Sequence, residues 1–369
     1  MSLQLEGVDE IAIRAGDRER ADPERYPSET IAEFFASGLM SAPLPVTAGG
    51  SGWTALHATR AIEAIAATSP SAALITAMPL GLAGITGAGP ELAPPEHRAA
   101  WAAQCEAVAA DYGAGRLYAA CNSEAGAGGS LAATKTVAQR LGDGGWKVTG
   151  TKILASSGRN ADMFLSTAKV APDDLPGAGT VEFFFVPTRA SGVAIANDWD
   201  GFGMRATESQ TVRYEDASAS GLWGFPNFIE VAQPITYWYC LFAAIPLGCA
   251  AGMLRILSTP APASPAVRLR LADARMKIES LAAYLHETAA QWRPAAGPAY
   301  AARVLRTKTY VTAEATRLCA ELFALSGGRH YRRGGDAARL LADAFAGTAL
   351  RPPLALALDA LVEGFEGGE

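Results

Sequence analysis

Two neighbouring stretches decide the fold of this chain, CNSEAGAGGS (residues 121–130) and GDGGWKVTGTKILASSGRNADMFL (residues 142–165). The first has little side-chain bulk after Glu124, so either its backbone turns tightly or a large, flat ligand lies against it. The second begins with a turn signal, GDGG, between two alternating runs, which predicts a β-hairpin. A run such as GAGG is by itself more often a plain tight loop, and the neighbouring strand end ILASS is what favours a ligand.

The pattern of the chain changes on either side of this β-rich segment. Residues 1–113 repeat apolar side chains at helical spacing, and residues 227–369 return to long amphipathic helical patterns. Between them, residues 114–226 hold short β-rich runs punctuated by Gly and Pro. This order predicts a multidomain α+β protein with an N-terminal helical domain, a middle β-sandwich or barrel domain and a C-terminal four-helix-type bundle.

Composition narrows the classes of partner. The chain has 369 residues, a formal net charge of −6 and no run of Lys or Arg, so neither nucleic acid nor an anionic membrane is an expected partner. The five cysteines are scattered and form no CxxC pair, which indicates reduced thiols in a cytoplasmic protein. The four histidines never stand at metal-ligand spacing, so no metal site is expected.

One uncharged stretch, residues 234–254, approaches the length of a membrane span. It contains Pro246 and has no basic cluster beside it, and we interpret it as a buried core helix. The first residues, MSLQLEGVDEIAIRAG, carry charges from the start and do not have the pattern of a signal peptide. Only 18% of the residues are charged, so buried subunit interfaces are expected.

Several motifs, in the same order, make the chain similar to the acyl-CoA dehydrogenase family. CNSEAGAGGS resembles that family's T-E-P-G-A-G-S-D loop, and residues 142–165 resemble its G-D-x-x-x-(I/L)-x-G-x-K-x-(W/F)-I-(T/S)-(N/S)-(G/A) hairpin followed by A-D. WDGFGMRATESQTVRYEDASAS (199–220) is similar to its G-x-R segment, and PVTAGGSGW (45–53) to P-E-x-x-G-G-x-G. SGG (326–328) with Asp343 and AGT (346–348) is similar to the C-terminal G-G … R-D … (E)-G-T.

The resemblance implies that FAD binds non-covalently between the middle domain and the C-terminal bundle. Ser123 falls where the family's Thr or Ser touches the flavin pyrimidine edge, and Ser156 falls where a Thr or Ser hydrogen-bonds the flavin N5 atom. Leu154 takes the place of the aromatic residue that usually covers the ring. The other implied cofactor contacts are Cys121 and Asn122 through their backbone, Ala155, and Gly328 and Thr348 at the adenosine end.

The resemblance also implies a small-molecule substrate, acyl-CoA-like or aromatic, and a homodimer or homotetramer. Gly128 and Ser130 would lie beside the substrate, and Tyr237, Trp238 and Tyr239 would form an aromatic pocket wall, although core aromatics are an equally good interpretation. Arg205 is interpreted as a salt-bridged structural residue rather than a ligand.

Three departures from the family pattern bear on the reaction. The family's catalytic glutamate is replaced by Ala346, and a methyl group cannot act as a base. A second known location of the base, a D-x-x-R on a core helix, is occupied by Tyr237-Trp238-Tyr239. The connection at residues 254–273 is short and Pro-rich, without the R-x-x-F-G and Gln that grip the FAD pyrophosphate of a neighbouring subunit.

These departures leave three hypotheses open and no catalytic residue assigned. The first is an acyl-CoA dehydrogenase-like oxidoreductase with a moved base, for which Asp343 and Glu230 are the nearest carboxylates. The second is a flavin-dependent monooxygenase of the same fold, which needs no α-proton base. The third is a non-catalytic relative with weakened FAD binding. An electron-transfer partner or a flavin reductase would accompany the first two.

Overall fold

The computed structural model describes residues 6–332 and 335–366 of the chain. Helices open the fold, and they pack around the almost wholly buried α4. The helix α4 carries Pro79 in its interior, and the hydroxyl of Tyr112 on α5 donates to the Pro79 carbonyl oxygen (2.7 Å). The α-helices of this part are α1 (Glu6–Ala21), α2 (Ser28–Ala36), α3 (Ala55–Ala66), α4 (Pro70–Thr86) and α5 (Arg98–Gly113).

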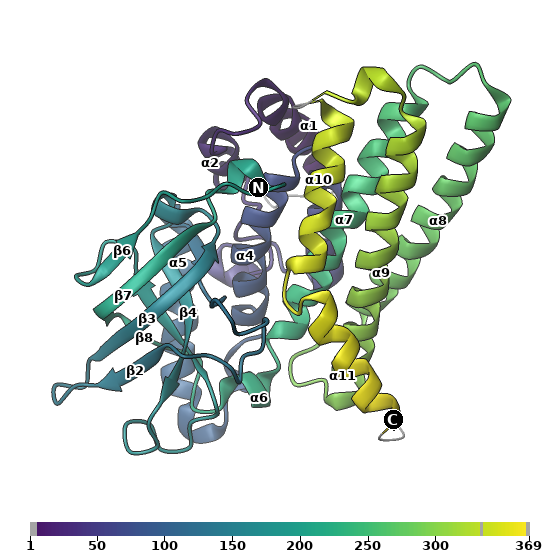
Figure 1. Ribbon diagram of the computed structural model, residues 1–369. Helices are drawn as coiled ribbons and strands as arrows, with labels where there is room; N and C mark the ends of the chain where they lie inside the picture. Colours follow the sequence, from purple (N-terminus) through teal and green to yellow (C-terminus); the bar gives the residue numbers. More distant parts are fainter. Residues whose placement is uncertain (1–5, 333–334, 367–369) are drawn as a thin grey trace.

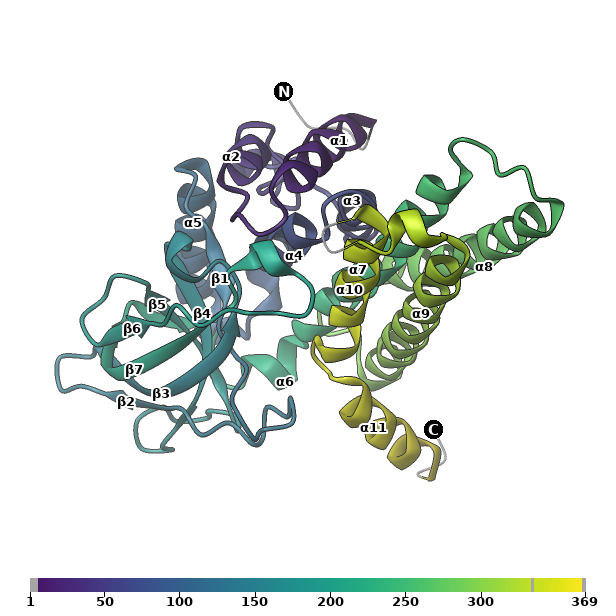
Figure 2. The same ribbon diagram turned by 45° about the horizontal axis from the view of Figure 1, so that its top comes forward.

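The middle of the chain is a curved, strongly twisted sheet (Figures 1 and 2). Its strands follow the order β6-β7-β3-β2-β4-β5-β8, and β1 pairs in parallel with β4. The expected hairpin is present, because β2 and β3 are antiparallel and the GDGG turn joins them. The strands are β1 (Tyr118–Ala120), β2 (Val137–Arg140), β3 (Trp146–Ala155), β4 (Met163–Val170), β5 (Glu182–Pro187), β6 (Val193–Ile195), β7 (Gln210–Ala219) and β8 (Gly221–Trp223).

The C-terminal part is a bundle in which α7 (Ile235–Ser258), α8 (Pro265–Ala290), α9 (Pro298–Leu325) and α10 (Asp336–Ala349) run side by side (Figures 1 and 2). The short α6 (Phe228–Ala232) leads into it, and α11 (Leu354–Glu366) follows. The fold class expected from the sequence, helices, then a β domain, then a helical bundle, is confirmed.

Within the described residues, α7 is the helix that is both long and apolar enough to cross a membrane. It is nevertheless the central helix of the bundle, and most of its side chains are buried against α3, α4, α9 and α10. Close packing on α3 is possible because α7 has Gly248, where a Cβ atom would lie 2.3 Å from the Glu63 carbonyl oxygen. The interpretation of residues 234–254 as a buried core helix therefore agrees with the packing.

Candidate functional site

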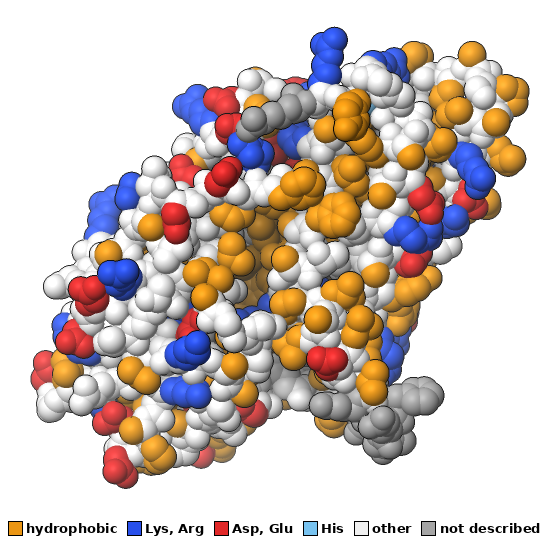
Figure 3. Space-filling model, in the orientation of Figure 1, with side chains coloured by type: hydrophobic (Ala, Val, Ile, Leu, Met, Phe, Trp, Pro, Cys, Tyr) orange, Lys and Arg blue, Asp and Glu red, His pale blue; other side chains and the backbone are white. Residues whose placement is uncertain are grey.

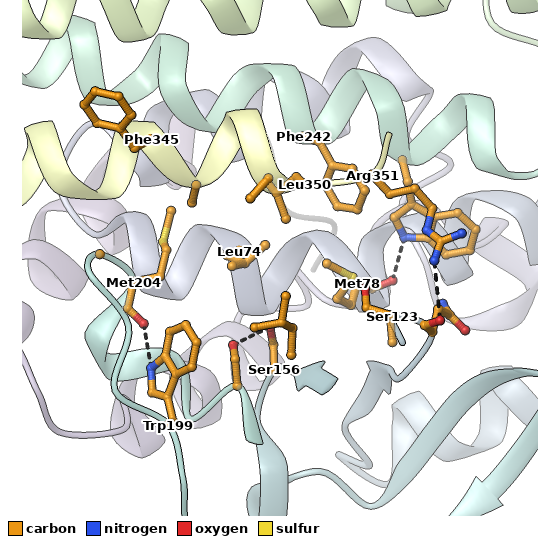
Figure 4. Close-up of a pocket in the computed structure, with 18 of the residues that line it drawn as sticks. Leu74, Met78, Ser123, Ser156, Trp199, Met204, Phe242, Phe345, Leu350 and Arg351 are labelled. Atoms are coloured by element: carbon orange, nitrogen blue, oxygen red, sulfur yellow. Dashed lines mark hydrogen bonds between the residues drawn. The ribbon is translucent and has the colours of Figure 1, made fainter. Parts of the chain in front are cut away.

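A cavity of about 320 Å³ opens between the β domain and the helices. In Figure 3 it is the recess at the centre of the face, and hydrophobic side chains surround its mouth. Figure 4 shows the two walls: Leu74, Met78, Phe345 and Leu350 project from the helical side, whereas Ser123, Ser156 and Trp199 come from the β domain. The cavity thus lies at the junction of the domains, where ligand sites are common.

One face of α7 forms part of the helical wall. Ile235, Trp238 and Phe242 line the cavity, and their spacing places them on the same side of a helix. Trp238 lies against Gly81 of α4, and its indole Nε1 donates to the Met78 carbonyl oxygen (3.3 Å). These contacts fix the indole ring at the edge of the cavity.

The aromatic triplet predicted to contact substrate is divided by the helix. Successive helical residues point about 100° apart, so Tyr237 and Tyr239 cannot share the direction of Trp238. Tyr237 is buried against Gly84 and packs edge-on against Trp292, with ring centroids 4.8 Å apart. Neither tyrosine is on the cavity wall, and their role in substrate binding stays a prediction.

The β-domain wall is built from the loop and the hairpin that carry the sequence motifs. Asn122, Ser123, Leu154 and Ser156 all line the cavity, and the Ser123 carbonyl oxygen accepts from the backbone N–H of Ile153 (2.8 Å). Two segments that are about thirty residues apart in sequence are therefore paired at the site. The side-chain oxygen Oδ1 of Asn122 is buried and has no hydrogen-bond partner among the described residues.

The backbone at the end of β3 is bent to present these residues. The pairing of β3 with β7 shifts register between Lys152 and Ala155, and Leu154 has a φ of 58° in the left-handed region. A branched residue rarely adopts this conformation, and such strain is concentrated at ligand sites. Leu154 is consequently 49% exposed at the cavity, while Ser156 next to the bend bonds Ser209 (Oγ to Oγ, 3.0 Å).

A buried ion pair holds the 121–130 loop against the hairpin. The Lys152 ammonium donates to Glu124 Oε1 (2.7 Å) and to the Thr167 carbonyl oxygen (2.7 Å), and its side chain is fully buried. The Glu124 carboxylate also accepts from the hydroxyl of Thr136 (2.7 Å) and the backbone N–H of Lys135 (2.6 Å). Burial raises the pKa of Glu124, but these donors outweigh it and hold that pKa at about 2. Sequence reasoning missed this pair, which fixes Ser123 in place.

A third segment, residues 199–205, closes one end of the cavity. The Trp199 indole Nε1 donates to the Met204 carbonyl oxygen (3.2 Å), and the Met204 backbone N–H donates to Asp343 Oδ1 (2.6 Å). A Cβ atom on Gly203 would lie 2.4 Å from the Ala342 carbonyl oxygen, so only glycine permits this approach to α10. Arg205 pairs with Glu24 (2.7 Å), as a structural residue would.

The two carboxylates considered as a replacement base both lie off the cavity wall. Asp343 is 2% exposed, holds the Met204 backbone and lies 3.7 Å from Arg339, and burial raises its pKa. Glu230 lies on α6 beside Gly179. Ala346 does line the cavity, but its methyl group carries no proton chemistry. Among the described residues of the wall, Arg351 is the single ionisable side chain.

The remaining predicted residues do not line the cavity. Cys121 and Ala155 are fully buried behind the β-domain wall, and Gly128 and Ser130 lie further along the loop. Thr348 is in the last turn of α10, where its hydroxyl donates to the Phe345 carbonyl oxygen, whereas Gly328 precedes α10. A 14-residue helix is about 20 Å long, so α10 separates these two residues within one chain. Their contacts stay predictions.

The short connection after α7 is a proline-rich loop. The helix ends at Ser258, Thr259-Pro260 follow, and α8 begins at Pro265. Pro lacks the backbone N–H that would continue α7, which is why the helix stops there. The loop supplies no residue to the cavity.

Comparison with protein families gives the same family for all three parts of the chain. Models described as the N-terminal, middle and C-terminal domains of acyl-CoA dehydrogenase match residues 8–102, 119–217 and 241–350, respectively. The chain is 31% identical over 217 residues to L-evernosamine nitrososynthase from a Micromonospora species, a match that covers 56% of this chain and 47% of that enzyme. It is 24% identical over 335 residues to the probable acyl-CoA dehydrogenase YngJ of Bacillus subtilis, with 86% and 84% covered.

Solved structures show the same fold at low identity. Butyryl-CoA dehydrogenase from Megasphaera elsdenii superposes with a TM-score of 0.82 at 19% identity, covering 99% of both chains. FMN-bound TdsC from Paenibacillus sp. A11-2 gives 0.80 at 20% identity with 98% of both chains covered. KijD3 in complex with FMN gives 0.81 at 20% identity, covering 98% of this chain and 94% of that one.

Proposed function

This chain belongs to the acyl-CoA dehydrogenase family, and from that premise we propose that it is a flavin-dependent monooxygenase acting on a small, flat, apolar substrate. The observation that carries the proposal is the cavity wall, which is apolar and has no carboxylate, imidazole, thiol or phenol among its described residues. Removal of an α-proton from an acyl thioester needs a positioned base, and the transfer of an oxygen atom to an apolar substrate does not.

The residues present fit a flavin. A flat ring system needs a narrow apolar slot with hydrogen-bond partners along one edge, and Ser123, Ser156 and Asn122 provide that edge on the β-domain side. The unpartnered Oδ1 atom of Asn122 is a ready acceptor for a ligand N–H. A reduced flavin held here would supply two electrons to dioxygen, of which one oxygen atom enters the substrate and the other leaves as water.

The chain's own residues would bind and orient the flavin and the substrate, and they would exclude water. Ser156 would hold the central edge of the ring, and the Lys152–Glu124 pair holds the loop that carries Ser123 against β3. Trp238, Phe242 and Phe345 would cover the opposite side of the ring with apolar surface, which would limit the water that reaches the reacting atoms. Their ring faces also suit an aromatic substrate.

Both FMN and FAD are compatible with this site. The sequence predicts FAD, as its similarity to the dehydrogenases YngJ and butyryl-CoA dehydrogenase would suggest. The similar structures of TdsC and KijD3, however, contain FMN. Calorimetric titration with each flavin separates the two, because equal dissociation constants would mean that the adenosine is not recognised.

Ser156→Ala is expected to weaken flavin binding by about 1 kcal/mol, or roughly fivefold, because the hydroxyl contributes one hydrogen bond of ordinary strength. Calorimetry of the wild type and the variant measures the difference. Ser280→Ala, on the exposed face of α8, is the matched control and should leave the affinity unchanged. An unchanged affinity in Ser156→Ala would contradict the assigned position of the ring.

The oxygenase reaction itself is tested with a flavin reductase, NADH, isotope-labelled dioxygen and aromatic substrates without and with a carboxylate, such as indole, dibenzothiophene and 2-naphthoate. Incorporation of one labelled oxygen atom into the product supports the proposal. If the protein binds flavin and oxidises none of the aromatic substrates but does oxidise acyl-CoA, the proposal is wrong. If neither FMN nor FAD binds, the chain is the non-catalytic relative that the short connection after α7 favours.

We further propose a cytoplasmic homo-oligomer. All five cysteines are free, which suits a reducing compartment. Leu269 and Met276 on α8 and Tyr310 on α9 are more than half exposed, so the outer face of the bundle offers apolar surface to a second copy. Sedimentation at micromolar concentration should give a dimer or tetramer, and a stable monomer would contradict this expectation.

A further inference from the structure

Among the described residues, Arg351 is the one cation on the wall of this apolar cavity, and no described carboxylate forms an ion pair with it. Arg351 follows α10, and its Nη2 donates to the Asn122 carbonyl oxygen (3.4 Å). Its other terminal nitrogen, Nη1, is buried without a hydrogen-bond partner among the described residues. Figure 4 shows the guanidinium at the Ser123 end of the cavity, opposite the Trp199 end.

Nearby charges are already committed to other partners. Glu124 is a carboxylate near enough to raise the pKa of Arg351. Its two oxygens, however, already accept hydrogen bonds from Lys152, Thr136 and Lys135. The Tyr239 phenol is neutral, because burial raises its pKa to about 12. Burial lowers the pKa of Arg351 itself, which still stays charged at neutral pH because the ordinary value of a guanidinium is above 12.

The segment that carries Arg351 is held rigidly. The ammonium of the buried Lys308, on α9, donates to three backbone carbonyl oxygens, those of Gly347 (3.2 Å), Leu350 (2.8 Å) and Pro352 (2.7 Å). The turn after α10 is therefore pinned on both sides of Arg351. A pinned cation with a free, buried donor is a preorganised anion site, because leaving it unpaired costs free energy that a ligand anion would recover.

We propose that Arg351 recognises a carboxylate or another single anionic group on the substrate, whose flat apolar body lies against Trp238 and Phe242. The substrate class is thus an aromatic or alicyclic acid small enough for the part of the cavity beside Trp238, Phe242 and Arg351 that the flavin would leave open. This inference rests on the proposed function for the identity of the site as a substrate site. Anion recognition itself is a property of the chain that is measured without turnover.

The test uses 2-naphthoate and its neutral analogue 2-naphthamide as probes, with the full-length protein at pH 7.5, where the carboxylate is ionised. Binding is measured by calorimetry and by quenching of tryptophan fluorescence, with and without saturating FMN. The variants are Arg351→Met, Arg351→Lys and, as a matched control, Arg213→Met on the exposed face of β7. Melting temperatures and the 2-naphthamide affinity report whether each variant is folded around the cavity.

Wild-type protein is expected to bind 2-naphthoate about 10- to 100-fold more tightly than Arg351→Met does, since hydrogen bonds to charged groups are the strong ones. Arg351→Lys should recover part of that difference, and 2-naphthamide and the Arg213→Met control should show no change. Equal affinity of wild type and Arg351→Met for 2-naphthoate overturns the proposal. So does an Arg351→Met variant that loses FMN affinity and not 2-naphthoate affinity, because Arg351 would then contact the flavin. If the protein binds no flavin but Arg351→Met still weakens the binding of 2-naphthoate, the anion site is supported and the proposed oxygenase function is wrong.

Discussion

Flavin-loaded protein, supplied with an artificial electron acceptor, is expected to leave straight-chain acyl-CoA substrates of every length unoxidised at enzymatic rates. The reason is the proton. An α-proton beside a thioester is only modestly acidic, and general-base catalysis contributes roughly a hundred- to ten-thousand-fold to its removal. Ala346 stands where the family has its glutamate, and no described residue of the cavity wall is a carboxylate.

The measurement is steady-state reduction of the acceptor with a panel of acyl-CoAs. Turnover around one per second or faster would be typical of an enzyme and would contradict the expectation. In that event Asp343→Asn and Glu230→Gln identify the missed base. Asp343 now holds the Met204 backbone N–H, so Asp343→Asn should also be checked for loss of stability before a loss of rate is interpreted.

Lys152→Met is expected to lower the free energy of unfolding by about 3–5 kcal/mol, which is the range for removing one partner of a buried ion pair. The substitution leaves the Glu124 carboxylate buried with no ammonium beside it, and it leaves the Thr167 carbonyl oxygen without its donor. Because Glu124 holds the loop that carries Ser123, the binding of flavin and of 2-naphthoate should weaken as well.

Urea denaturation measures the loss of stability. Lys135→Met is the matched control, because its exposed side chain is removed while its backbone N–H still donates to Glu124. The double variant Lys152→Met with Glu124→Leu should recover part of the loss, since two apolar side chains leave no unpaired charge. A loss below 1 kcal/mol in Lys152→Met would show that the pair contributes no more than a surface salt bridge.

The Lys152–Glu124 pair also predicts that the stability of the fold decreases at acidic pH. Burial raises the pKa of Glu124, and the hydrogen bonds from Lys152, Thr136 and Lys135 lower it by more, to about 2 in the folded protein. A carboxyl group with a depressed pKa in the folded state stabilises the fold fully above its unfolded pKa. That stabilisation is lost as the pH falls from about 4.5 to about 2. The wild type should therefore lose more stability over this range than the double variant.

Much of the site could be predicted from the sequence because it is built from local motifs. The loop at 121–130 and the strand end ILASS each have a backbone requirement that is visible in their own residues, and the family resemblance implied that both lie beside one ligand. The structure pairs them through Ser123 and Ile153. The absence of a base at Ala346 is also a local fact. These features depend on residues close in sequence, which is where patterns are informative.

The direction of each side chain was the harder part. Tyr237, Trp238 and Tyr239 have similar chemistry, but the helix sends each to a different neighbour, and only Trp238 reaches the cavity. The spacing of Ile235, Trp238 and Phe242 was the available signal for that face. Asp343 matches a family position by sequence, and only its bond to the Met204 backbone shows that it holds the 199–205 segment against α10.

By itself, the sequence determined the order of the domains, the loop-and-hairpin pair that meets the cavity, and the lack of a catalytic carboxylate at the family's two known locations. Only the tertiary structure decided that Arg351 is the charge on the cavity wall, that Lys308 holds it there, and that Lys152 and Glu124 are buried together. The physical reason is that the cost of burying a charge depends on which groups surround it. Those groups come from segments tens to hundreds of residues apart, as with Arg351 and Asn122, and folding alone brings them into contact.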